Sequence, residues 1–444
     1  MDNTRHSAAK ILCSVYEKDA YANILVASEI RKNNYNDIDR RFLTEIVYGS
    51  VKMGLTLDWI LNKYITRPLK KIPPMVRAIL RISVYQIFYM DKVPISAICN
   101  EAVKLTKKYA HQGTANFVNA VLRSMDREKE KAKIPTEEKN RLEFLSLATG
   151  HPLWIIKRWE ELFGYDETKK LAELNNKEPI LSVRTNTLKT TREEIFKELS
   201  KQNIESKLSE IVPEGILISK HNSLDNMEII QSGKAQVQDE SSMLVAHILS
   251  PEENDFVIDL CAAPGGKTTH IAALMKNKGK ILATDIYSHK LTKINENAKR
   301  LGIDIIETKE LDGREIGNAY ENKADKVLVD APCSGLGVLR RRPDARLKKT
   351  EEDIKKLPIL QNELLESGAK AVKNGGVLVY STCTIEPREN EEVVIKFLDK
   401  HSEFYLDNTG DCLPLKKRDE KMIQLLPTRD NTDGFFIARM IKKG

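Results

Sequence analysis

The feature that most constrains the fold is an alternation of short apolar runs and helical stretches in the C-terminal half of the chain. From about residue 236, each apolar run is followed by a stretch with helical periodicity before the next run begins. This alternation is typical of a parallel, doubly wound sheet. The predicted strands are 256–260, 280–284, 326–329 and 377–380. Ligands of such sheets bind at the carboxyl ends of the strands, so the residues that follow each strand are the first candidates for a site.

The first predicted strand runs into a glycine-rich turn, DLCAAPGGKTTH, at residues 259–270. Its Gly-Lys-Thr end is similar to that of a phosphate-binding P-loop, but a P-loop needs a glycine five residues before Gly266, where Cys261 stands. The G-x-G-x-x-G fingerprint of dinucleotide-binding folds is also absent. The turn therefore indicates a ligand other than a nucleoside triphosphate or a dinucleotide.

A carboxylate at the end of the second strand indicates what that ligand is. Asp285 lies 19 residues after Gly266, where an acidic side chain can accept hydrogen bonds from ribose hydroxyls. It would repel a triphosphate, whereas S-adenosylmethionine carries a ribose and no phosphate. We therefore predict that the loop binds S-adenosylmethionine, and Asp312, after a third and weaker strand region, is a further candidate.

Two cysteines follow the last two predicted strands. Cys333 lies in DAPCSG at residues 330–335, and Cys383 lies in STC at residues 381–383. Enzymes that methylate exocyclic amines of bases usually carry an aromatic residue at the first position. A thiolate suits another reaction, because its addition to carbon 6 of a pyrimidine makes carbon 5 nucleophilic toward a methyl donor. Spacing alone does not say which cysteine attacks, and both could instead be buried packing residues.

The remaining cysteines and histidines give no sign of a disulfide framework or a metal site. The six cysteines form no C-x-x-C pair, and the eight histidines form no H-E-x-x-H motif. No apolar run reaches the ~18 residues of a membrane span. We therefore expect no metal, no membrane association and a soluble cytoplasmic protein.

The first part of the chain differs in both pattern and charge. Residues 1–126 have helical periodicity, with an apolar stripe at 76–88, a second helix at 95–109 and a turn at Gly113. Residues 1–130 carry 21 Lys and Arg against 13 Asp and Glu, whereas the remainder carries 50 against 51. The excess positive charge of the first part favours a polyanionic partner, although an ordinary solvated basic surface is the alternative.

Between these regions lies a charged stretch at 126–140, interpreted as a linker or solvated helix, and then an α+β segment at 141–235. A strand is predicted at 180–184, and a capping box at 190–193 is predicted to open a helix that ends near residue 202.

With these motifs the chain resembles a known family, the RNA 5-methylcytosine methyltransferases. Within that family it is most similar to the bacterial Sun/Fmu (RsmB) type, which acts on small-subunit ribosomal RNA. The first 126 residues are similar to the helical NusB-type RNA-binding domain of that type. The stretches that carry the resemblance are DLCAAPGGKT (259–268), VQDESS (237–242), LVDAPCSGLGVLRRRPD (328–344), LVYSTCTIEPRENE (378–391) and DGFFIARMIKK (433–443).

The resemblance implies an α/β class I S-adenosylmethionine-dependent methyltransferase fold with a Rossmann-like, doubly wound sheet. It implies an all-α NusB-like domain at 1–130, a small α+β substrate-side domain at 141–235 and the catalytic domain at 236–444. The implied reaction is methylation of cytosine C5 in 16S ribosomal RNA through a covalent cysteine–C6 adduct, by a monomer. The alternatives are the same chemistry on tRNA or another rRNA site, and a non-catalytic RNA-binding assembly factor.

The resemblance also assigns residue roles. Cys383 is the implied nucleophile and Cys333 assists product release, whereas DNA cytosine methyltransferases use the cysteine at the position of Cys333. Asp330 and Lys267 are implied to face the cytosine. The implied cofactor residues are Cys261, Ala262, Ala263, Pro264, Gly265, Gly266, Lys267, Asp285, Asp312 and Asp330. Two residues depart from the family pattern, since Leu347 replaces an expected tryptophan and Thr384 a commoner serine.

Overall fold

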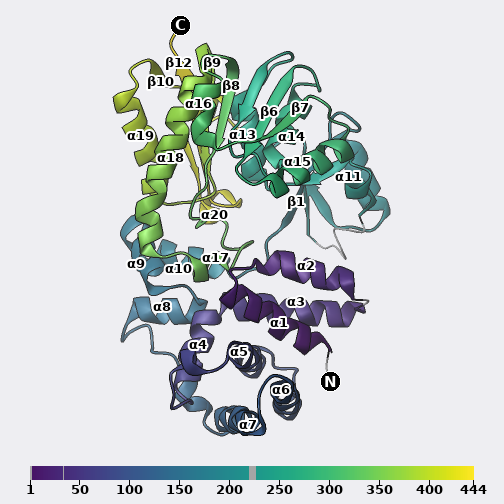
Figure 1. The fold of residues 1–444 in the computed structure, drawn as a ribbon, viewed down its shortest axis with the longest axis vertical. Helices are drawn as coiled ribbons and strands as arrows, with labels where there is room; N and C mark the ends of the chain where they lie inside the picture. Colours follow the sequence, from purple (N-terminus) through teal and green to yellow (C-terminus); the bar gives the residue numbers. More distant parts are fainter. Residues whose placement is uncertain (1–2, 34, 220–226) are drawn as a thin grey trace. The chain divides into compact units, whose positions relative to one another are not determined.

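The computed structural model describes residues 3–33, 35–219 and 227–444 (Figure 1). The chain divides into two compact units. The first comprises residues 1–177 together with 339–349, and the second comprises 178–338 together with 350–444. Each unit is considered by itself below.

The first unit is helical, as predicted for its N-terminal part. The predicted apolar stripe lies on α5, where Val76, Ile79, Leu80 and Val84 are buried in the core of the unit. The predicted turn at Gly113 is wrong, because this glycine lies in the first turn of α7. The helices are α1 (Asn3–Glu17), α2 (Ala22–Lys32), α3 (Asp37–Lys52), α4 (Gly54–Asn62), α5 (Pro74–Tyr89), α6 (Ile95–Tyr109), α7 (Gln112–Arg127), α8 (Arg141–Thr149), α9 (Leu153–Phe163), α10 (Tyr165–Leu174) and α17 (Ala345–Lys348).

The segment 339–349 reaches this unit from far along the sequence, which sequence reasoning missed. Its Arg346 is fully buried and donates hydrogen bonds to the Thr149 carbonyl at 3.1 Å and to Asn176 Oδ1 at 3.0 Å. Leu347, which departs from the family pattern, packs against the helical core. The leucine therefore adds an apolar side chain to the core of the helical unit.

The second unit begins with a four-stranded antiparallel sheet in the order β2-β3-β1-β4. Its helix α11 has the predicted capping box, but one residue later than expected, with Thr191 and Glu194 as the reciprocal pair. The elements are β1 (Leu181–Thr185), α11 (Arg192–Lys201), β2 (Ser206–Leu208), β3 (Gly215–Ile218), α12 (Glu228–Gln231) and β4 (Ala235–Val237).

The remainder of the second unit is built on an eight-stranded sheet with the order β10-β12-β9-β8-β5-β6-β7, in which β11 also pairs with β12. The five strands from β9 to β7 are parallel, as predicted, whereas β12 is antiparallel to β9. The strands are β5 (Phe256–Asp259), β6 (Lys280–Asp285), β7 (Ile306–Glu310), β8 (Ala324–Asp330), β9 (Val372–Thr382), β10 (Phe404–Leu406), β11 (Met422–Leu425) and β12 (Phe435–Lys442).

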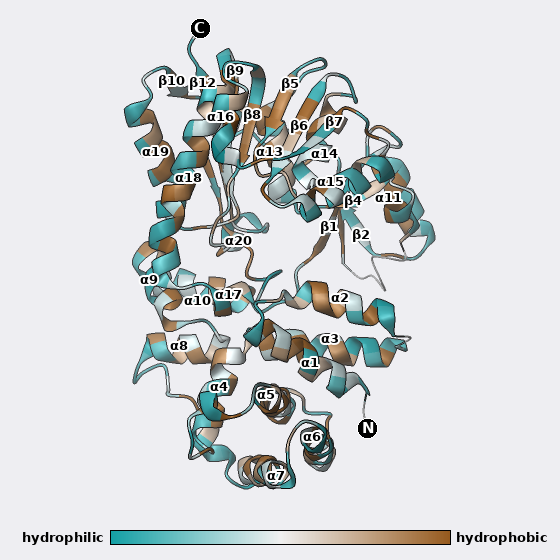
Figure 2. Cartoon of the chain, in the orientation of Figure 1, coloured by the Kyte–Doolittle hydropathy of each residue, from teal (hydrophilic) through white to brown (hydrophobic). Residues whose placement is uncertain are grey.

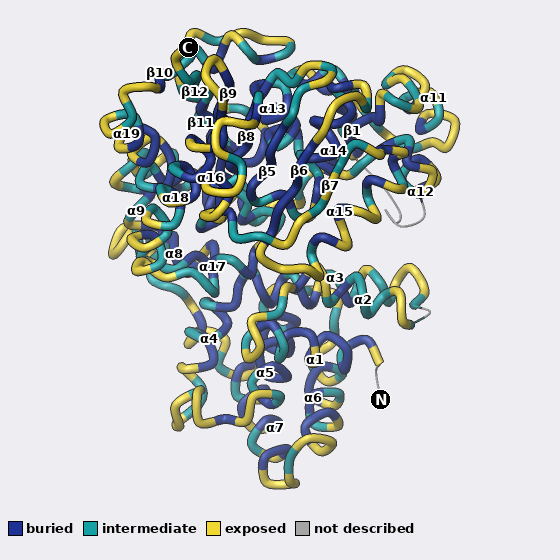
Figure 3. The backbone as a smooth tube through the Cα atoms, turned by 45° about the horizontal axis from the view of Figure 1, so that its top comes forward, coloured by how far each residue is buried: buried dark blue, intermediate teal, exposed yellow. Residues whose placement is uncertain are grey.

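Helices cover both faces of this sheet, because successive strand side chains point to opposite faces. Val257 of β5 belongs to an apolar core that includes residues of α13 and α14, whereas its neighbour Ile258 belongs to a separate core that includes residues of α16, α18 and α19. The central strands are accordingly apolar and buried along their length (Figures 2 and 3). The helices are α13 (Glu240–Leu249), α14 (Gly266–Leu274), α15 (Ser288–Leu301), α16 (Ile316–Ala319), α18 (Glu351–Ala371), α19 (Glu391–Lys400) and α20 (Pro427–Asp430).

Among the described residues, no helix combines the length and apolar character needed to cross a bilayer.

Candidate active site

The predicted site residues gather where the strand order reverses. From β5 the chain continues to β6 and β7 on one side and then returns to β8 and β9 on the other. This switch point is where doubly wound sheets open a crevice beyond the carboxyl ends of their strands. Asp259, Asp285 and Asp330 are the last residues of β5, β6 and β8, and Cys383 follows β9 directly.

The glycine loop joins β5 to α14. Gly265 adopts a left-handed φ of 93°, and a Cβ there would approach Ile294 to 3.2 Å, so the position strongly favours glycine. Thr268 Oγ1 donates a 2.7 Å hydrogen bond to Asp259 Oδ2, which ties the first turn of the helix to the end of the strand. Burial raises the pKa of Asp259 to about 7, and its Oδ1 has no hydrogen-bond partner among the described residues.

Two further cofactor candidates, Asp285 and Asp312, differ in their surroundings. Asp285 is buried, and among the described residues only its Oδ1 is engaged, by the Tyr287 amide at 3.0 Å and by Lys290 Nζ at 3.5 Å. Asp312 is partly exposed and forms a close ion pair with Arg314, whose Nη2 lies 2.7 Å from Oδ2. The hydrogen bonds from Arg314 lower the pKa of Asp312. Asp285 therefore keeps an oxygen available to a ligand, whereas both oxygens of Asp312 are engaged by Arg314.

The two cysteines face each other, as their positions after neighbouring strands predict. The Sγ atoms of Cys333 and Cys383 lie 3.3 Å apart, and both are free thiols. The hydrogen bond with Cys383, together with burial, raises the pKa of Cys333 well above its ordinary value. Cys333 therefore holds its proton more firmly than an ordinary thiol, and either sulfur can be the donor in this contact.

A partly buried ion pair lies beside the thiols. Lys267 Nζ is 2.8 Å from Asp330 Oδ2, and Ser381 Oγ donates to Asp330 Oδ1 at 2.8 Å. Burial alone would lower the pKa of Lys267, but the charge and hydrogen bond of Asp330, together with the charges of Cys383 and Asp259, raise this pKa. Lys267 also interacts electrostatically with Cys383 and lies 5.0 Å from the ring centroid of Phe435. A cation near a thiol stabilises the thiolate form.

Glu389 holds the two cysteine loops together, and sequence reasoning assigned it no role. Its Oε2 accepts hydrogen bonds from the Ser334 amide at 2.8 Å and from Gln361 Nε2 at 3.0 Å. Thr384 Oγ1 is 2.8 Å from Ser334 Oγ, so the threonine that departs from the family pattern supplies a hydroxyl to this network. Nothing in the sequence distinguishes Glu389 from the neighbouring Glu391, because only the fold shows that Glu389 is buried.

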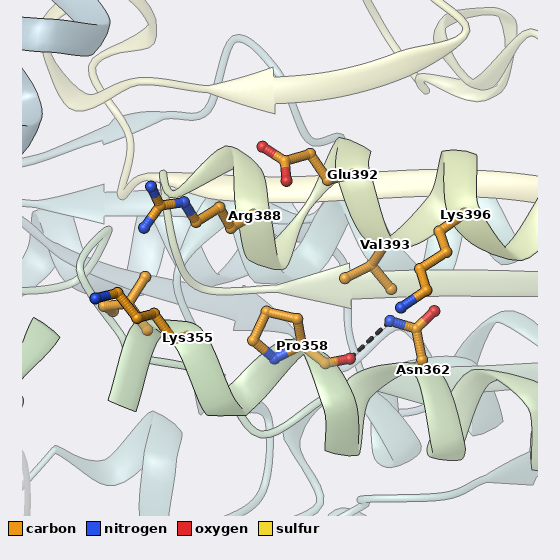
Figure 4. Close-up of a pocket in the computed structure, with 8 residues that line it drawn as sticks. Lys355, Pro358, Asn362, Arg388, Glu392, Val393 and Lys396 are labelled. Carbon is orange, nitrogen blue, oxygen red and sulfur yellow. Dashed lines mark hydrogen bonds between the residues drawn. The ribbon is translucent and has the colours of Figure 1, made fainter. Parts of the chain in front are cut away.

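A surface pocket of about 340 Å³ lies elsewhere, between α18 and the segment of η5 (Pro387–Glu389) and α19 (Figure 4). Asn362 Nδ2 donates to the Pro358 carbonyl at its edge. The lining residues are Ile354, Lys355, Pro358, Asn362, Arg388, Glu392, Val393 and Lys396. None of them is a predicted cofactor or catalytic residue, so the chemistry is better assigned by the convergence of side chains at the strand ends.

One group among the described residues has donors suited to a metal ion, namely Glu214, His247 and His270, whose potential ligand atoms lie within 4.8 Å of one another. The imidazole Nε2 atoms are 2.9 and 2.5 Å from Glu214 Oε1. Burial, together with the charge of Arg184, lowers the pKa of His270 to about 4. A nearby arginine disfavours a second cation, and the absence of a bound metal in the functional protein stays a prediction.

Comparison with known proteins places this arrangement in a family. Residues 246–441 match the model of the 16S rRNA methyltransferase RsmB/F family, residues 2–127 match the NusB family, and residues 151–225 match the ferredoxin-like domain of RsmF/B-like methyltransferases. A probable ribosomal RNA small subunit methyltransferase B of Bacillus subtilis is 39% identical, over 100% of this chain and 99% of its own length. The chain belongs to the RsmB/F family.

Solved structures agree with this membership of the RsmB/F family. The crystal structure of PH0851 superposes with a TM-score of 0.87 at 32% identity, over 100% of this chain and 99% of that chain. The structure of NSun6 from Pyrococcus horikoshii with SFG has a TM-score of 0.59 at 27% identity, over 66% of this chain and 98% of the other. The chain therefore combines a NusB domain, a ferredoxin-like domain and a methyltransferase fold, and the predicted fold class is confirmed.

Proposed function

We propose that this protein uses S-adenosylmethionine to methylate carbon 5 of a cytosine in 16S ribosomal RNA through a covalent cysteine adduct. The observation that carries the proposal is the 3.3 Å approach of Cys333 and Cys383 Sγ beside the Lys267–Asp330 pair. Membership of the RsmB/F family supports ribosomal RNA as the substrate, since the relatives' names describe small-subunit methyltransferases. The NusB-like residues 1–130 are proposed to bind RNA, with 141–235 on the substrate side and 236–444 catalytic.

The chain's residues fit S-adenosylmethionine. Asp285 is buried with Oδ2 free of hydrogen bonds from the described residues, as a ribose-binding carboxylate requires. The tight turn at Gly265 lets the backbone of 261–266 approach a ligand closely. When bound, the cofactor supplies an electrophilic methyl group. Asp312 would have to release Arg314 before it could contribute both oxygens to the same site.

The two thiols are proposed to act in sequence. The Cys383 thiolate adds to carbon 6 of the cytosine, and the resulting enamine attacks the methyl group through carbon 5. As Cys383 leaves carbon 6, Cys333 donates its proton to the departing sulfur and takes up the carbon 5 proton, so that both thiols are regenerated and the methylated cytosine is released. Two features support the assignment: Lys267 stabilises negative charge at Cys383, and the 3.3 Å approach of the two sulfurs lets a proton pass from Cys333 to Cys383.

Substitution of each cysteine separates the possible roles. Cys383→Ala is expected to abolish both methyl transfer and any covalent protein–RNA adduct, because no enamine forms. Cys333→Ala is expected to methylate once and then to accumulate an adduct that survives denaturing electrophoresis. The measurement combines transfer of labelled methyl groups to 16S RNA with denaturing gels. An adduct on Cys383→Ala instead would reverse the roles, and full turnover by both variants would make the cysteines packing residues.

The target is tested in cells. Mapping of 5-methylcytosine in ribosomal RNA and tRNA, with and without this protein, is expected to reveal one loss in 16S RNA. A loss in tRNA or in another ribosomal RNA would support the alternative substrates. Unchanged methylation, with altered ribosomal assembly, would support a non-catalytic assembly factor.

A further inference from the structure

A buried arginine of the four-stranded sheet bonds to the start of the helix that follows the glycine loop. Arg184, on β1, is 1% exposed. Its Nη1 donates to the Gly266 carbonyl at 2.7 Å, and its Nη2 donates to Thr269 Oγ1 at 3.1 Å. Nη1 also donates to Gln238 Oε1. Gly266 and Thr269 both lie in the first turn of α14.

Two effects make this position unfavourable for a positively charged side chain. Burial lowers the pKa of Arg184 to about 9, and the amino end of a helix carries a partial positive charge that repels a cation. Glu214 supplies an opposing charge, and the imidazoles of His247 and His270 lie at 2.9 and 2.5 Å from its Oε1. Burial of the Arg184 guanidinium costs free energy, and Glu214 offsets part of this cost. We take this as an indication that the hydrogen bonds from Arg184 to the glycine loop do more than stabilise α14.

The hydrogen bonds continue from Arg184 into the loop. Thr269 Oγ1 donates to the Gly265 carbonyl at 2.7 Å and lies 3.1 Å from the Gly266 carbonyl. Arg184 therefore contacts one end of a short network that includes the left-handed Gly265. The network fixes how the backbone turns from 261–265 into α14.

We propose that Arg184 is a positioning residue for the cofactor, which holds the glycine loop in its ligand-binding shape through Gly266 and Thr269. The four-stranded sheet, which carries Arg184 on β1, would then support cofactor binding in addition to its proposed place on the substrate side. The inference rests on the proposed use of S-adenosylmethionine, and it assigns Arg184 a role that acts through Gly266 and Thr269.

The test is calorimetric titration of S-adenosylmethionine into full-length variants. Arg184→Met is expected to bind about tenfold more weakly, because the charge-assisted hydrogen bond to the Gly266 carbonyl and the bond to Thr269 Oγ1 are both lost. Arg184→Lys keeps the charge and can reach one carbonyl, so intermediate affinity is expected. In steady state, KM for the cofactor should rise by a similar factor while kcat and KM for RNA change little.

Arg300 offers a matched control. It joins α15 to the same sheet by donating to the Ile230 carbonyl at 2.7 Å and the Ala235 carbonyl at 3.2 Å. Among the described residues it makes no direct bond to the glycine loop, and its link to that loop runs through Asn297, which accepts from Arg300 at 3.2 Å and donates to the Pro264 carbonyl at 3.0 Å. Arg300→Met is expected to lower the urea midpoint of unfolding yet to bind the cofactor as the wild type does. Asp285→Ala provides the reference for a lost cofactor contact.

Each outcome decides a separate question. Wild-type cofactor affinity in Arg184→Met, or an equal loss in Arg300→Met, would overturn the positioning role. If Arg184→Met does not fold, the lysine variant decides, and wild-type affinity there would also overturn it. Failure of the wild type itself to bind S-adenosylmethionine would instead refute the proposed function.

Discussion

At the scale of single residues, the site contains groups whose protonation depends on their surroundings. Asp259 ends β5 with one oxygen bonded to Thr268 and the other without a partner, and burial raises its pKa to about 7 from 3.8. Such a carboxyl keeps its proton at pH values where a solvated aspartate has lost it. Its charge is therefore set by burial, because removal from water disfavours the ionised form.

A pH-dependent stability follows for Asp259. Between about pH 4 and pH 7 the unfolded chain loses this proton while the folded chain keeps it, so the free energy of unfolding falls as pH rises, on the order of 1 kcal/mol per pH unit at most. Asp259→Asn removes the titration and keeps an acceptor for Thr268. Urea unfolding at pH 4.5 and 7.5 is expected to show the wild type losing stability relative to the variant. A constant difference would mean that the folded carboxyl is already ionised at the lower pH.

At the scale of elements, the two cysteine loops depend on η5 and α18. The loop with Cys333 follows β8, and the loop with Cys383 follows β9. The distance between the two thiols therefore depends on contacts between the loops as well as on the strands. Glu389 of η5 makes the connection by accepting hydrogen bonds from the Ser334 amide and from Gln361 of α18. The geometry of the thiol pair is therefore a property of several elements packed together.

Glu389→Gln is expected to lower kcat about tenfold, because the amide nitrogen of glutamine replaces one acceptor and leaves a buried donor unpaired. Affinity for S-adenosylmethionine should stay near that of the wild type, since Glu389 does not bond to the glycine loop. Glu391→Gln, at an exposed position two residues away, is the control and should retain full activity. Loss of cofactor binding in Glu389→Gln would show that the carboxylate supports the whole catalytic unit instead of the cysteine loops.

At the scale of the whole molecule, positive charge is concentrated in the first 130 residues, whose net charge is +8 (21 against 13) while that of the remainder is −1 (50 against 51). A deletion would test this region poorly, because segment 339–349 packs into the same helical core. Charge removal in the full chain leaves that core in place.

Substitution of Lys70, Lys71, Lys107 and Lys108 by alanine is expected to weaken RNA binding and to flatten its salt dependence. The logarithmic salt slope should fall by about 0.7–0.9 for each phosphate contact removed. The matched control removes four exposed lysines of the second unit, at 197, 201, 276 and 278. Binding measured between 50 and about 200 mM salt gives the slopes. Equal effects in both variants would refute a special role for the N-terminal charge.

Local sequence alone predicted the elements whose pattern repeats over several residues. The strands at 256–260 and 280–284 and the helix at 95–109 were predicted correctly, because apolar periodicity reports which face of an element is buried. The glycine loop and the convergence of Cys333 with Cys383 were also predicted, since parallel strands of one sheet end at the same edge. The capping box was misplaced by one residue, because Thr190 and Thr191 offer the same hydroxyl and only the backbone selects between them.

The tertiary structure decided what depends on residues distant in sequence. Arg184 meets Gly266 across 82 residues, Glu389 meets Ser334 across 55, and Arg346 meets Thr149 across 197. No periodicity or spacing marks such contacts, because each partner is an ordinary polar group until folding buries it and requires a hydrogen bond. The sequence by itself therefore determined the sheet, the loop and the pairing of the two thiols. Burial in the folded chain decided which polar residues hold them in place.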